Sequence, residues 1–303
     1  MRPAKIPTEE LMTSGHLACQ GCGATQAMRF ALKALGPRTA LVIPACCWSV
    51  IDGPFPHTSL KVPIFHTAFE AAASTASGLK AGLEMRGDRE TVVMAWAGDG
   101  GTFDIGIQAL SGAAERNEDI IYCCYDNEAY MNTGIQRSSS TPVGAWTTTT
   151  PVKHYKKRPK KKIIDILAAH SIPYIATASV AYPQDLIAKF KKAREIKGTR
   201  FIHVFAPCPT GWKLAPELSV AMARQAVTSK IFPLIEITDS GRAWKVWKDF
   251  TPTPVSDYIK AQGRFRHLGD EEIRGIEEEV ERAWLELLAR ENRSAELPGL
   301  KAD

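Results

Sequence analysis

The sequence lacks long apolar runs. No stretch approaches the roughly 20 apolar residues that a bilayer-spanning helix needs. The N-terminal region carries Glu9, Glu10 and His16 and has no apolar run of signal-peptide length. We therefore expect a cytoplasmic protein that neither spans a membrane nor is secreted. Internal repeats are also absent, and 45% hydrophobic with 23% charged residues over 303 positions excludes a disordered or collagen-like chain.

Acidic residues are missing from one strongly basic segment. It carries seven positive side chains, which are Lys153, Lys156, Lys157, Arg158, Lys160, Lys161 and Lys162. Since the whole chain has a net charge of +5, the rest of it without these seven charges sums to −2. The surface is therefore not generally basic, and we expect no binding to nucleic acid. The segment is either a solvated loop or a patch that docks an acidic partner.

The cysteines do not form the framework of a disulfide-rich secreted domain. Their number, seven, is odd, and they fall into a C-x-x-C pair (Cys19, Cys22), two adjacent pairs (Cys46/Cys47 and Cys123/Cys124) and a distant Cys208. In a reducing cytoplasm, clustered cysteines more often ligate metal or do redox work than form disulfides. Cys123 and Cys124 lie within a predicted strand, where we expect small buried hydrophobes.

Short β-branched apolar runs alternate with helix-patterned stretches, which predicts an α/β fold with an open, mostly parallel sheet flanked by helices. The predicted strands are residues 40–44, 91–96, 119–125, 174–177 and 200–205, and helices are predicted at 68–85 and 105–116. Apolar residues at steps of three and four predict an amphipathic packing helix over 270–291. We expect an α/β domain over 1–240 and a C-terminal extension over 241–303.

The unusual polar and thiol residues follow directly on predicted strands. In open parallel sheets, ligands bind in the crevice outside the carboxyl ends of the strands, so several such turns can form one site. Four turns qualify, and they contain Cys46 and Cys47, Gly98 to Gly101, Asp126 to Glu128, and Pro207 to Pro209.

The turn Gly98-Asp99-Gly100-Gly101 predicts an anion site that also needs a cation. It is not a dinucleotide fingerprint, because Phe103 stands where the third glycine belongs and the Asp99 carboxylate repels a pyrophosphate. A divalent cation removes that repulsion, since Mg²⁺ binds hard oxygen ligands and bridges them to phosphates. Asn127 follows Asp99 by about one strand–helix–strand step, so both side chains can share one Mg²⁺.

These residues carry the thiamine-diphosphate motif, which begins with GDG and ends in an Asn-containing turn about thirty residues later. The stretch from Gly98 to Pro151 closely resembles the β subunit of pyruvate:ferredoxin oxidoreductases (2-oxoacid:ferredoxin oxidoreductases), and GHLACQGCG and APCPTGW match that family outside this stretch. The resemblance extends from His16 to about Leu268. It implies the diphosphate-binding half of a thiamine-diphosphate fold, followed here by a helical extension.

The resemblance also implies roles for single residues. Asp99, the Asn127 side chain and the Ala129 carbonyl would hold Mg²⁺ on the diphosphate, and Asn132 would lie near the reactive thiazolium carbon as a catalytic residue. The cofactor-binding set is then Gly98, Asp99, Gly100, Gly101, Asn127, Ala129 and Asn132. Without that context, Asn127 and Asn132 are ordinary turn residues. His66 and Glu70 either approach the cofactor or form an interior pair.

Four thiolates, from Cys19, Cys22, Cys47 and Cys208, satisfy one [4Fe–4S] cluster. Zinc suits the same donors and remains the structural alternative, although an electron acceptor has a reason to lie beside thiamine diphosphate and zinc has none. In the family the matching cysteines ligate the cluster nearest thiamine. Cys46 stands where the family usually has glycine, so the choice of Cys47 over Cys46 stays open.

The resemblance implies a pyruvate synthase subunit that converts pyruvate and coenzyme A to acetyl-CoA and CO₂, with electrons passing through the cluster to ferredoxin. An α subunit would supply the activating Glu and the substrate contacts. Because the chain has no C-x₂-C-x₂-C-x₃-C-P run, ferredoxin-type clusters must lie on another subunit. Alternatives are the same chemistry on 2-oxoisovalerate, indolepyruvate, 2-oxoglutarate or oxalate, and a zinc-stapled binding module.

Overall fold

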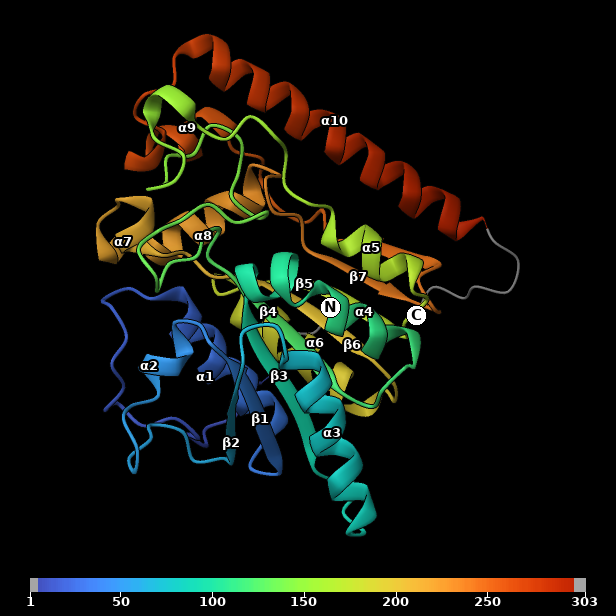
Figure 1. Ribbon diagram of the computed structural model, residues 1–303. Coiled ribbons are helices and arrows are strands. Elements are labelled where there is room, and N and C mark those ends of the chain that lie inside the picture. The colour runs from blue at the N-terminus through green and yellow to red at the C-terminus, as the bar shows by residue number, and fades with distance from the viewer. Residues whose placement is uncertain (1–4, 297–303) are drawn as a thin grey trace.

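The computed structural model describes residues 5–296, in which helices cover an eight-stranded sheet (Figure 1). The strand order is β2-β1-β3-β4-β6-β5-β7-β8; β1 to β6 are parallel, and β7 and β8 are added as antiparallel strands. The predicted fold class is therefore confirmed. The strands are β1 Thr39–Pro44, β2 Ile64–Thr67, β3 Val92–Gly98, β4 Ile121–Asp126, β5 Tyr174–Ser179, β6 Arg200–Phe205, β7 Ile235–Thr238 and β8 Ala243–Val246.

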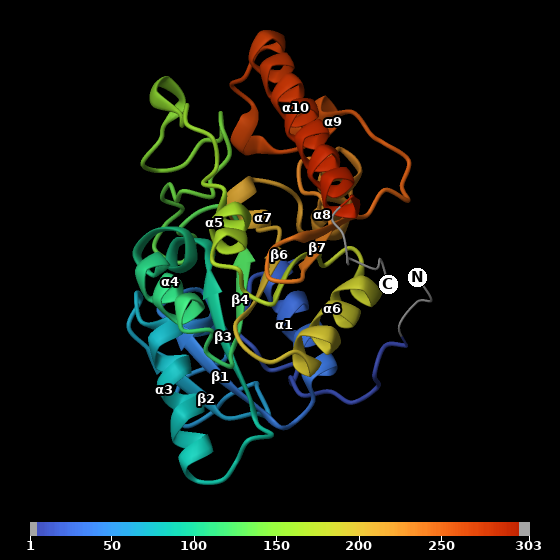
Figure 2. The ribbon, with the colours of Figure 1, turned by 90° about the vertical axis from the view of Figure 1, so that its right-hand side faces the viewer.

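Helices lie on both faces of the sheet because the strands are apolar on both sides. In β1, Leu41 and Ile43 belong to the core under α1 and α6, whereas Val42 belongs to the core under α3, α4 and α5. Figure 2 shows α3 and α4 on one side of the sheet and α1 and α6 on the other. The bounds are α1 Gly23–Leu35, α2 Trp48–Ile51, α3 Ala72–Met85, α4 Ile107–Glu115, α5 Ile163–Ala169 and α6 Pro183–Glu195.

All five predicted strands are present, as β1, β3, β4, β5 and β6, with ends within two residues of the prediction. The prediction missed β2, β7 and β8, which are four-residue strands with partly exposed side chains and so lack a long apolar run. The predicted helix at 68–85 begins only at Ala72, and a π-helical turn, Gly100–Ile105, precedes α4.

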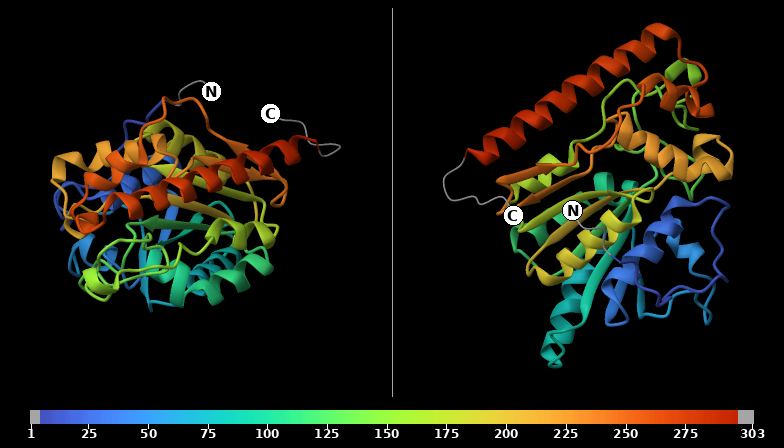
Figure 3. Two further views of the ribbon diagram at one scale, coloured as in Figure 1. Left: turned by 90° about the horizontal axis from the view of Figure 1, so that it is seen from above. Right: turned by 180° about the vertical axis from the view of Figure 1, so that it is seen from behind.

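The C-terminal part covers the β7–β8 edge of the sheet. It follows α7 Pro209–Trp212 and α8 Ser219–Thr228 and includes α9 Val255–Lys260 and α10 Asp270–Ala295, which contains the predicted amphipathic helix. Glu291 on α10 accepts a hydrogen bond from the Val246 N–H of edge strand β8 at 2.8 Å. Figure 3 shows α10 running along this side of the molecule. The domain boundary after residue 240 stays a prediction, and β8 lies beyond it in the same sheet.

None of the helices within residues 5–296 has the length and apolar character needed to cross a membrane.

Trp284 fixes α10 to the rest of the fold. Its side chain is 7% exposed and meets the Phe250 ring edge-to-face at a centroid distance of 6.0 Å. We expect Trp284→Ala to lower the free energy of unfolding by about 3 kcal/mol, because it leaves a cavity in a packed core. The neighbouring Leu285 is 57% exposed, so Leu285→Ala should change the free energy of unfolding by less than about 0.5 kcal/mol. Urea titrations of the two variants measure both changes. Equal losses in the two variants would contradict this role of Trp284.

Candidate cofactor site

Four loop turns meet at one edge of the sheet. The strands β1, β3, β4 and β6 are direct neighbours and parallel, so their carboxyl ends lie side by side. The turns that follow them contain Cys46 and Cys47, Asp99, Asn127, and Cys208. Two adjoining cavities, each of about 260 Å³, open among these turns.

The first cavity is formed by the turns after β1, β3 and β4. All seven residues predicted to bind the cofactor line it: Gly98, Asp99, Gly100, Gly101, Asn127, Ala129 and Asn132. Its wall also contains Phe69, Tyr125, Tyr130 and Met131, which the sequence did not single out because none of them belongs to a residue type with ligand or catalytic spacing. The cavity is therefore a glycine-lined pocket with a mostly apolar, partly aromatic wall, into which Asp99 and Asn127 bring polar groups.

Tyr130 packs directly on the glycine turn. A Cβ atom at Gly100 would lie 2.0 Å from Tyr130 Cε1, so no other residue fits there without moving the ring. The Tyr130 hydroxyl donates a hydrogen bond to Asp104 Oδ2 at 2.7 Å, which anchors the ring to the π-helical turn. This close packing fixes the backbone that follows Asp99.

Asp99 is a buried carboxylate. Its side chain is 1% exposed and accepts a hydrogen bond from Ser138 Oγ at 2.5 Å. No basic side chain among residues 5–296 forms an ion pair with it. Burial, together with the charge of Asp126, raises the pKa of Asp99 well above its usual range. A carboxylate in this position needs a cation to be stable in its charged form.

The Asn127 side chain and the Ala129 carbonyl approach the same carboxylate. The amide position of Asn127 that faces Asp99 lies 2.9 Å from Asp99 Oδ1 and 2.9 Å from the Ala129 carbonyl oxygen. With nitrogen in that position, the amide donates a hydrogen bond to each; with oxygen there, three oxygens face one another, which is stable only around a cation.

The two separations of 2.9 Å at the Asn127 amide are compatible with Mg²⁺. Its octahedral ligands lie at about 2.1 Å and at right angles, so adjacent ligand oxygens are about 3 Å apart. A carboxylate, an amide and a backbone carbonyl are hard oxygen donors, and they leave further positions for phosphate oxygens and water. The donor set of Asp99, Asn127 and Ala129 is therefore chemically suited to the metal predicted from the sequence.

The second cavity is lined by all four predicted cluster cysteines, Cys19, Cys22, Cys47 and Cys208. Cys46 does not line it and faces the first cavity instead. The loop of Cys19 and Cys22 is joined to the Cys208 turn by a hydrogen bond from Gly23 N to the Pro207 carbonyl at 3.0 Å. A Cβ atom at Gly23 would lie 2.7 Å from Pro207 N, so this contact requires glycine.

Cys19, Cys22, Cys47 and Cys208 line one cavity without forming a compact four-sulfur metal site. Four sulfurs around zinc lie about 3.8 Å apart, as a tetrahedron with 2.3 Å bonds requires. Within the described part of the chain, no three His, Cys, Asp or Glu side chains are gathered closely enough to hold one metal ion. The four sulfurs instead surround a cavity. Burial raises the pKa of Cys208 to about 11, so it is a protonated thiol until a metal binds.

The two cavities share a wall. Cys47, Asn127, Met131 and Asn132 line both of them, so Asn132 lies between the glycine turn and the cysteines. Groups held in the two cavities would be separated by single side chains.

Cys123, Cys124, His66 and Glu70 do not line either cavity. Cys123 and Cys124 are fully buried in β4 and face opposite cores, as expected for small hydrophobes. His66 pairs with Asp52, with His66 Nε2 2.9 Å from Asp52 Oδ2, and not with Glu70. Both His66 and Glu70 are exposed, so the expectation of an interior pair is wrong, whereas their approach to the cofactor stays a prediction.

The basic segment is only partly a solvated patch. Lys156 is buried and donates to the Ser139 carbonyl at 3.1 Å, and burial lowers its pKa to about 8. Lys160 forms an ion pair with Glu128, and Lys161 is half-buried. A solvated loop is therefore the wrong description for these three lysines. A docking role remains a hypothesis for the exposed side chains, which are Lys153, Lys157, Arg158 and Lys162.

The fold and the glycine turn define a class of cofactor enzyme. Residues 50–204 match the model of the C-terminal TPP-binding domain of thiamine pyrophosphate enzymes. The chain also resembles the 2-oxoglutarate:ferredoxin oxidoreductase structure from Magnetococcus marinus, with a TM-score of 0.58 and 21% identity over 73% of this chain and 82% of that one, which bears on the fold alone.

Sequence relatives identify the family within this class. Ketoisovalerate oxidoreductase subunit VorB of Pyrococcus furiosus is 51% identical over 92% of this chain and 93% of its own length. Pyruvate synthase subunit PorB of Methanothermobacter marburgensis is 50% identical over 93% of this chain and 99% of its own length. The chain therefore belongs to the 2-oxoacid:ferredoxin oxidoreductase family, as a thiamine-diphosphate-binding subunit of the PorB and VorB type.

Proposed function

We propose that this chain is the β subunit of a pyruvate:ferredoxin oxidoreductase, which oxidises pyruvate with coenzyme A to acetyl-CoA and CO₂ and passes the electrons to ferredoxin. The observation that carries the proposal is the pair of adjoining cavities, one lined by the glycine turn with Asp99 and Asn127 and one lined by four cysteines. The identity to the PorB subunit supports pyruvate as substrate. The equally high identity to the VorB subunit makes 2-oxoisovalerate the second candidate.

The first cavity would hold thiamine diphosphate with its metal. Asp99, Asn127 and Ala129 would bind Mg²⁺, which would in turn hold the diphosphate in the cavity that the glycine turn lines. When bound, thiamine diphosphate supplies the carbon nucleophile and electron sink for decarboxylation of a 2-oxo acid. Asn132 carries an amide into the space between the two cavities, where it can hydrogen-bond the oxygen of a substrate held there.

The second cavity would hold one [4Fe–4S] cluster on Cys19, Cys22, Cys47 and Cys208. Cys47 belongs to both cavities, so it would connect the cluster to the site of oxidation through a single side chain. Cys46 faces only the first cavity, which favours Cys47 as the ligand.

The chain is expected to work only within a complex. Its first cavity contains no glutamate to activate the aminopyrimidine ring, which an α subunit would supply together with substrate contacts. Ferredoxin-type clusters would lie on a further subunit.

The assay that tests the proposal uses the assembled complex, purified without oxygen and supplied with coenzyme A, a low-potential dye and a series of 2-oxo acids. We expect the highest kcat/KM with pyruvate and only background dye reduction by the isolated chain. The highest value with 2-oxoisovalerate would reassign the substrate. A complex that oxidises no 2-oxo acid, or a colourless protein with stoichiometric zinc, would contradict the proposed function.

A further inference from the structure

Glu128 lies in the turn that follows β4, between the predicted metal ligands Asn127 and Ala129. It has a φ of 69°, in the left-handed region that side chains other than glycine rarely adopt. Its side chain is 1% exposed. Because Asn127 and Ala129 flank it, this one backbone conformation decides where both of their oxygens point. A strained residue in such a place persists only if its surroundings hold it firmly.

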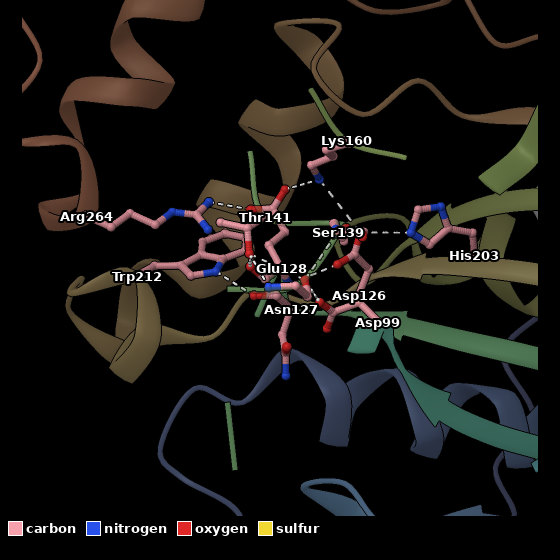
Figure 4. A network of polar contacts seen from close by, with 12 residues as sticks. Asp99, Asp126, Asn127, Glu128, Ser139, Thr141, Lys160, His203, Trp212 and Arg264 are labelled. Atoms are coloured by element: carbon pink, nitrogen blue, oxygen red, sulfur yellow. Dashed lines mark hydrogen bonds and ion pairs between the residues drawn. The ribbon is translucent and has the colours of Figure 1, made fainter. Parts of the chain in front are cut away.

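Every polar group of Glu128 has a partner within the protein. Its N–H donates to Asp126 Oδ1 at 2.9 Å, and its carbonyl accepts a hydrogen bond from Thr141 Oγ1 at 2.7 Å. Its carboxylate forms ion pairs with Lys160 and with Arg264, which approach it from different sides (Figure 4). Since both carboxylate oxygens are occupied by these cations, Glu128 is not itself a ligand for the metal.

Arg264 also contacts the turn through Trp212. The guanidinium lies 4.1 Å from the centre of a Trp212 ring, and the Trp212 indole N–H donates to the Asn127 carbonyl at 2.9 Å. Arg264 itself is 2% exposed and is held by a hydrogen bond from its Nε to Gln262 Oε1 at 2.9 Å. One buried cation therefore acts on the turn at both Asn127 and Glu128.

The two cations come from segments that the sequence gives no reason to connect with the cofactor. Lys160 belongs to the basic segment, and Arg264 belongs to the C-terminal extension between α9 and α10. Lys160 Nζ also lies 3.7 Å from Asp126 Oδ2. The Lys160 ammonium group therefore forms ion pairs with the carboxylates of both neighbours of Asn127, Asp126 and Glu128. Burial lowers the pKa of Lys160, but the attraction of Glu128 and Asp126 outweighs it and leaves that pKa raised, so the cation is present at neutral pH.

We propose that Arg264 and Lys160 are positioning residues for the cofactor metal: through Glu128 they hold residues 127–129 in the conformation that aims the Asn127 side chain and the Ala129 carbonyl at Asp99. The inference rests on the proposed function, because the ligand is its Mg²⁺. Without the two cations, a buried and unpaired Glu128 carboxylate would move toward water, and the left-handed turn would relax. The C-terminal extension is thereby part of the cofactor site.

The experiment uses the assembled complex, stripped of Mg²⁺ and thiamine diphosphate by chelation and dialysis. Mg²⁺ is then titrated at saturating thiamine diphosphate and followed by calorimetry. We expect Arg264→Met and Lys160→Met each to raise the Kd for Mg²⁺ at least tenfold, and Arg264→Lys to recover part of the loss because it keeps the charge. The matched control is Arg290→Met, which removes the ion pair with Asp165 that joins α10 to α5. It should lower the thermal midpoint and leave the Kd for Mg²⁺ unchanged.

An unchanged Kd for Mg²⁺ in both charge-removing variants, with only the thermal midpoint lowered as in the control, would overturn the inference. If Arg264→Met fails to assemble, Lys160→Met decides alone, since the Lys160 side chain is 29% exposed and tolerates replacement better. The proposed function fails in a different way: the unmodified complex would then bind thiamine diphosphate without any need for Mg²⁺, or not bind it.

Discussion

Replacing Asp99 by asparagine should reduce 2-oxo acid oxidation by the complex by about a hundredfold or more. The substitution keeps the shape of the side chain and its ability to accept the Ser138 hydrogen bond, but it removes the only carboxylate of the proposed Mg²⁺ site. Loss of a residue that merely orients a metal ligand typically costs 10–100-fold, so loss of a charged ligand should cost at least as much. The rate of dye reduction and the Kd for Mg²⁺ measure the effect.

Ser138→Ala is the graded control for this prediction. It removes the hydrogen bond to Asp99 and leaves the negative charge in place, so we expect a loss of only about tenfold. Excess Mg²⁺ should restore much of the activity of Ser138→Ala and little of that of Asp99→Asn. An Asp99→Asn complex that keeps its activity and its dependence on Mg²⁺ would show that the metal binds elsewhere.

Cys47→Ser should remove the cluster, whereas Cys46→Ser should not. Cys47 lines the cavity together with Cys19, Cys22 and Cys208, and a serine oxygen is a poor ligand for the soft iron sites of a cluster. We expect the complex with Cys47→Ser to lose roughly four iron atoms per copy of the chain and to reduce ferredoxin at background rates. Iron analysis, visible absorbance and EPR after reduction report the loss.

The adjacent cysteine makes a closely matched control. Cys46 differs from Cys47 by one position, and its N–H donates to Ser49 Oγ at 2.9 Å in the turn after β1. Since Cys46 faces only the cofactor cavity, Cys46→Ser should keep the full iron content. The opposite pattern, with iron lost from Cys46→Ser and retained in Cys47→Ser, would exchange the roles of the two residues.

The sequence predicts those site residues that directly follow a buried parallel strand. The five buried strands are apolar runs of ordinary length, and four of them end in a residue type that needs an explanation. Parallel pairing places such ends at one edge of the sheet, and because β1, β3, β4 and β6 are direct neighbours the two sets of site residues meet there. The one residue choice that composition could not make, Cys46 or Cys47, depends on the direction of two side chains within a single turn.

The sequence could not show what supports the site. Seven positive charges within residues 153–162, with no acid among them, indicate an exposed patch, because the acids that pair with them lie far away in the chain: Glu128 for Lys160 and Asp104 for Lys161. Arg264 is similarly remote from Glu128, and the edge strands β7 and β8 are too short to give a periodic signal. These features depend on tertiary contacts, for which local sequence patterns contain no information.

The central claim is that this chain carries an iron–sulfur cluster directly beside its thiamine site. Anomalous diffraction from crystals of the anaerobically purified complex, collected on both sides of the iron absorption edge, tests it most directly. We expect a strong iron peak in the cavity lined by Cys19, Cys22, Cys47 and Cys208, next to the cavity of Asp99. A peak that appears only at the zinc edge, or no metal peak between these four cysteines, would contradict it.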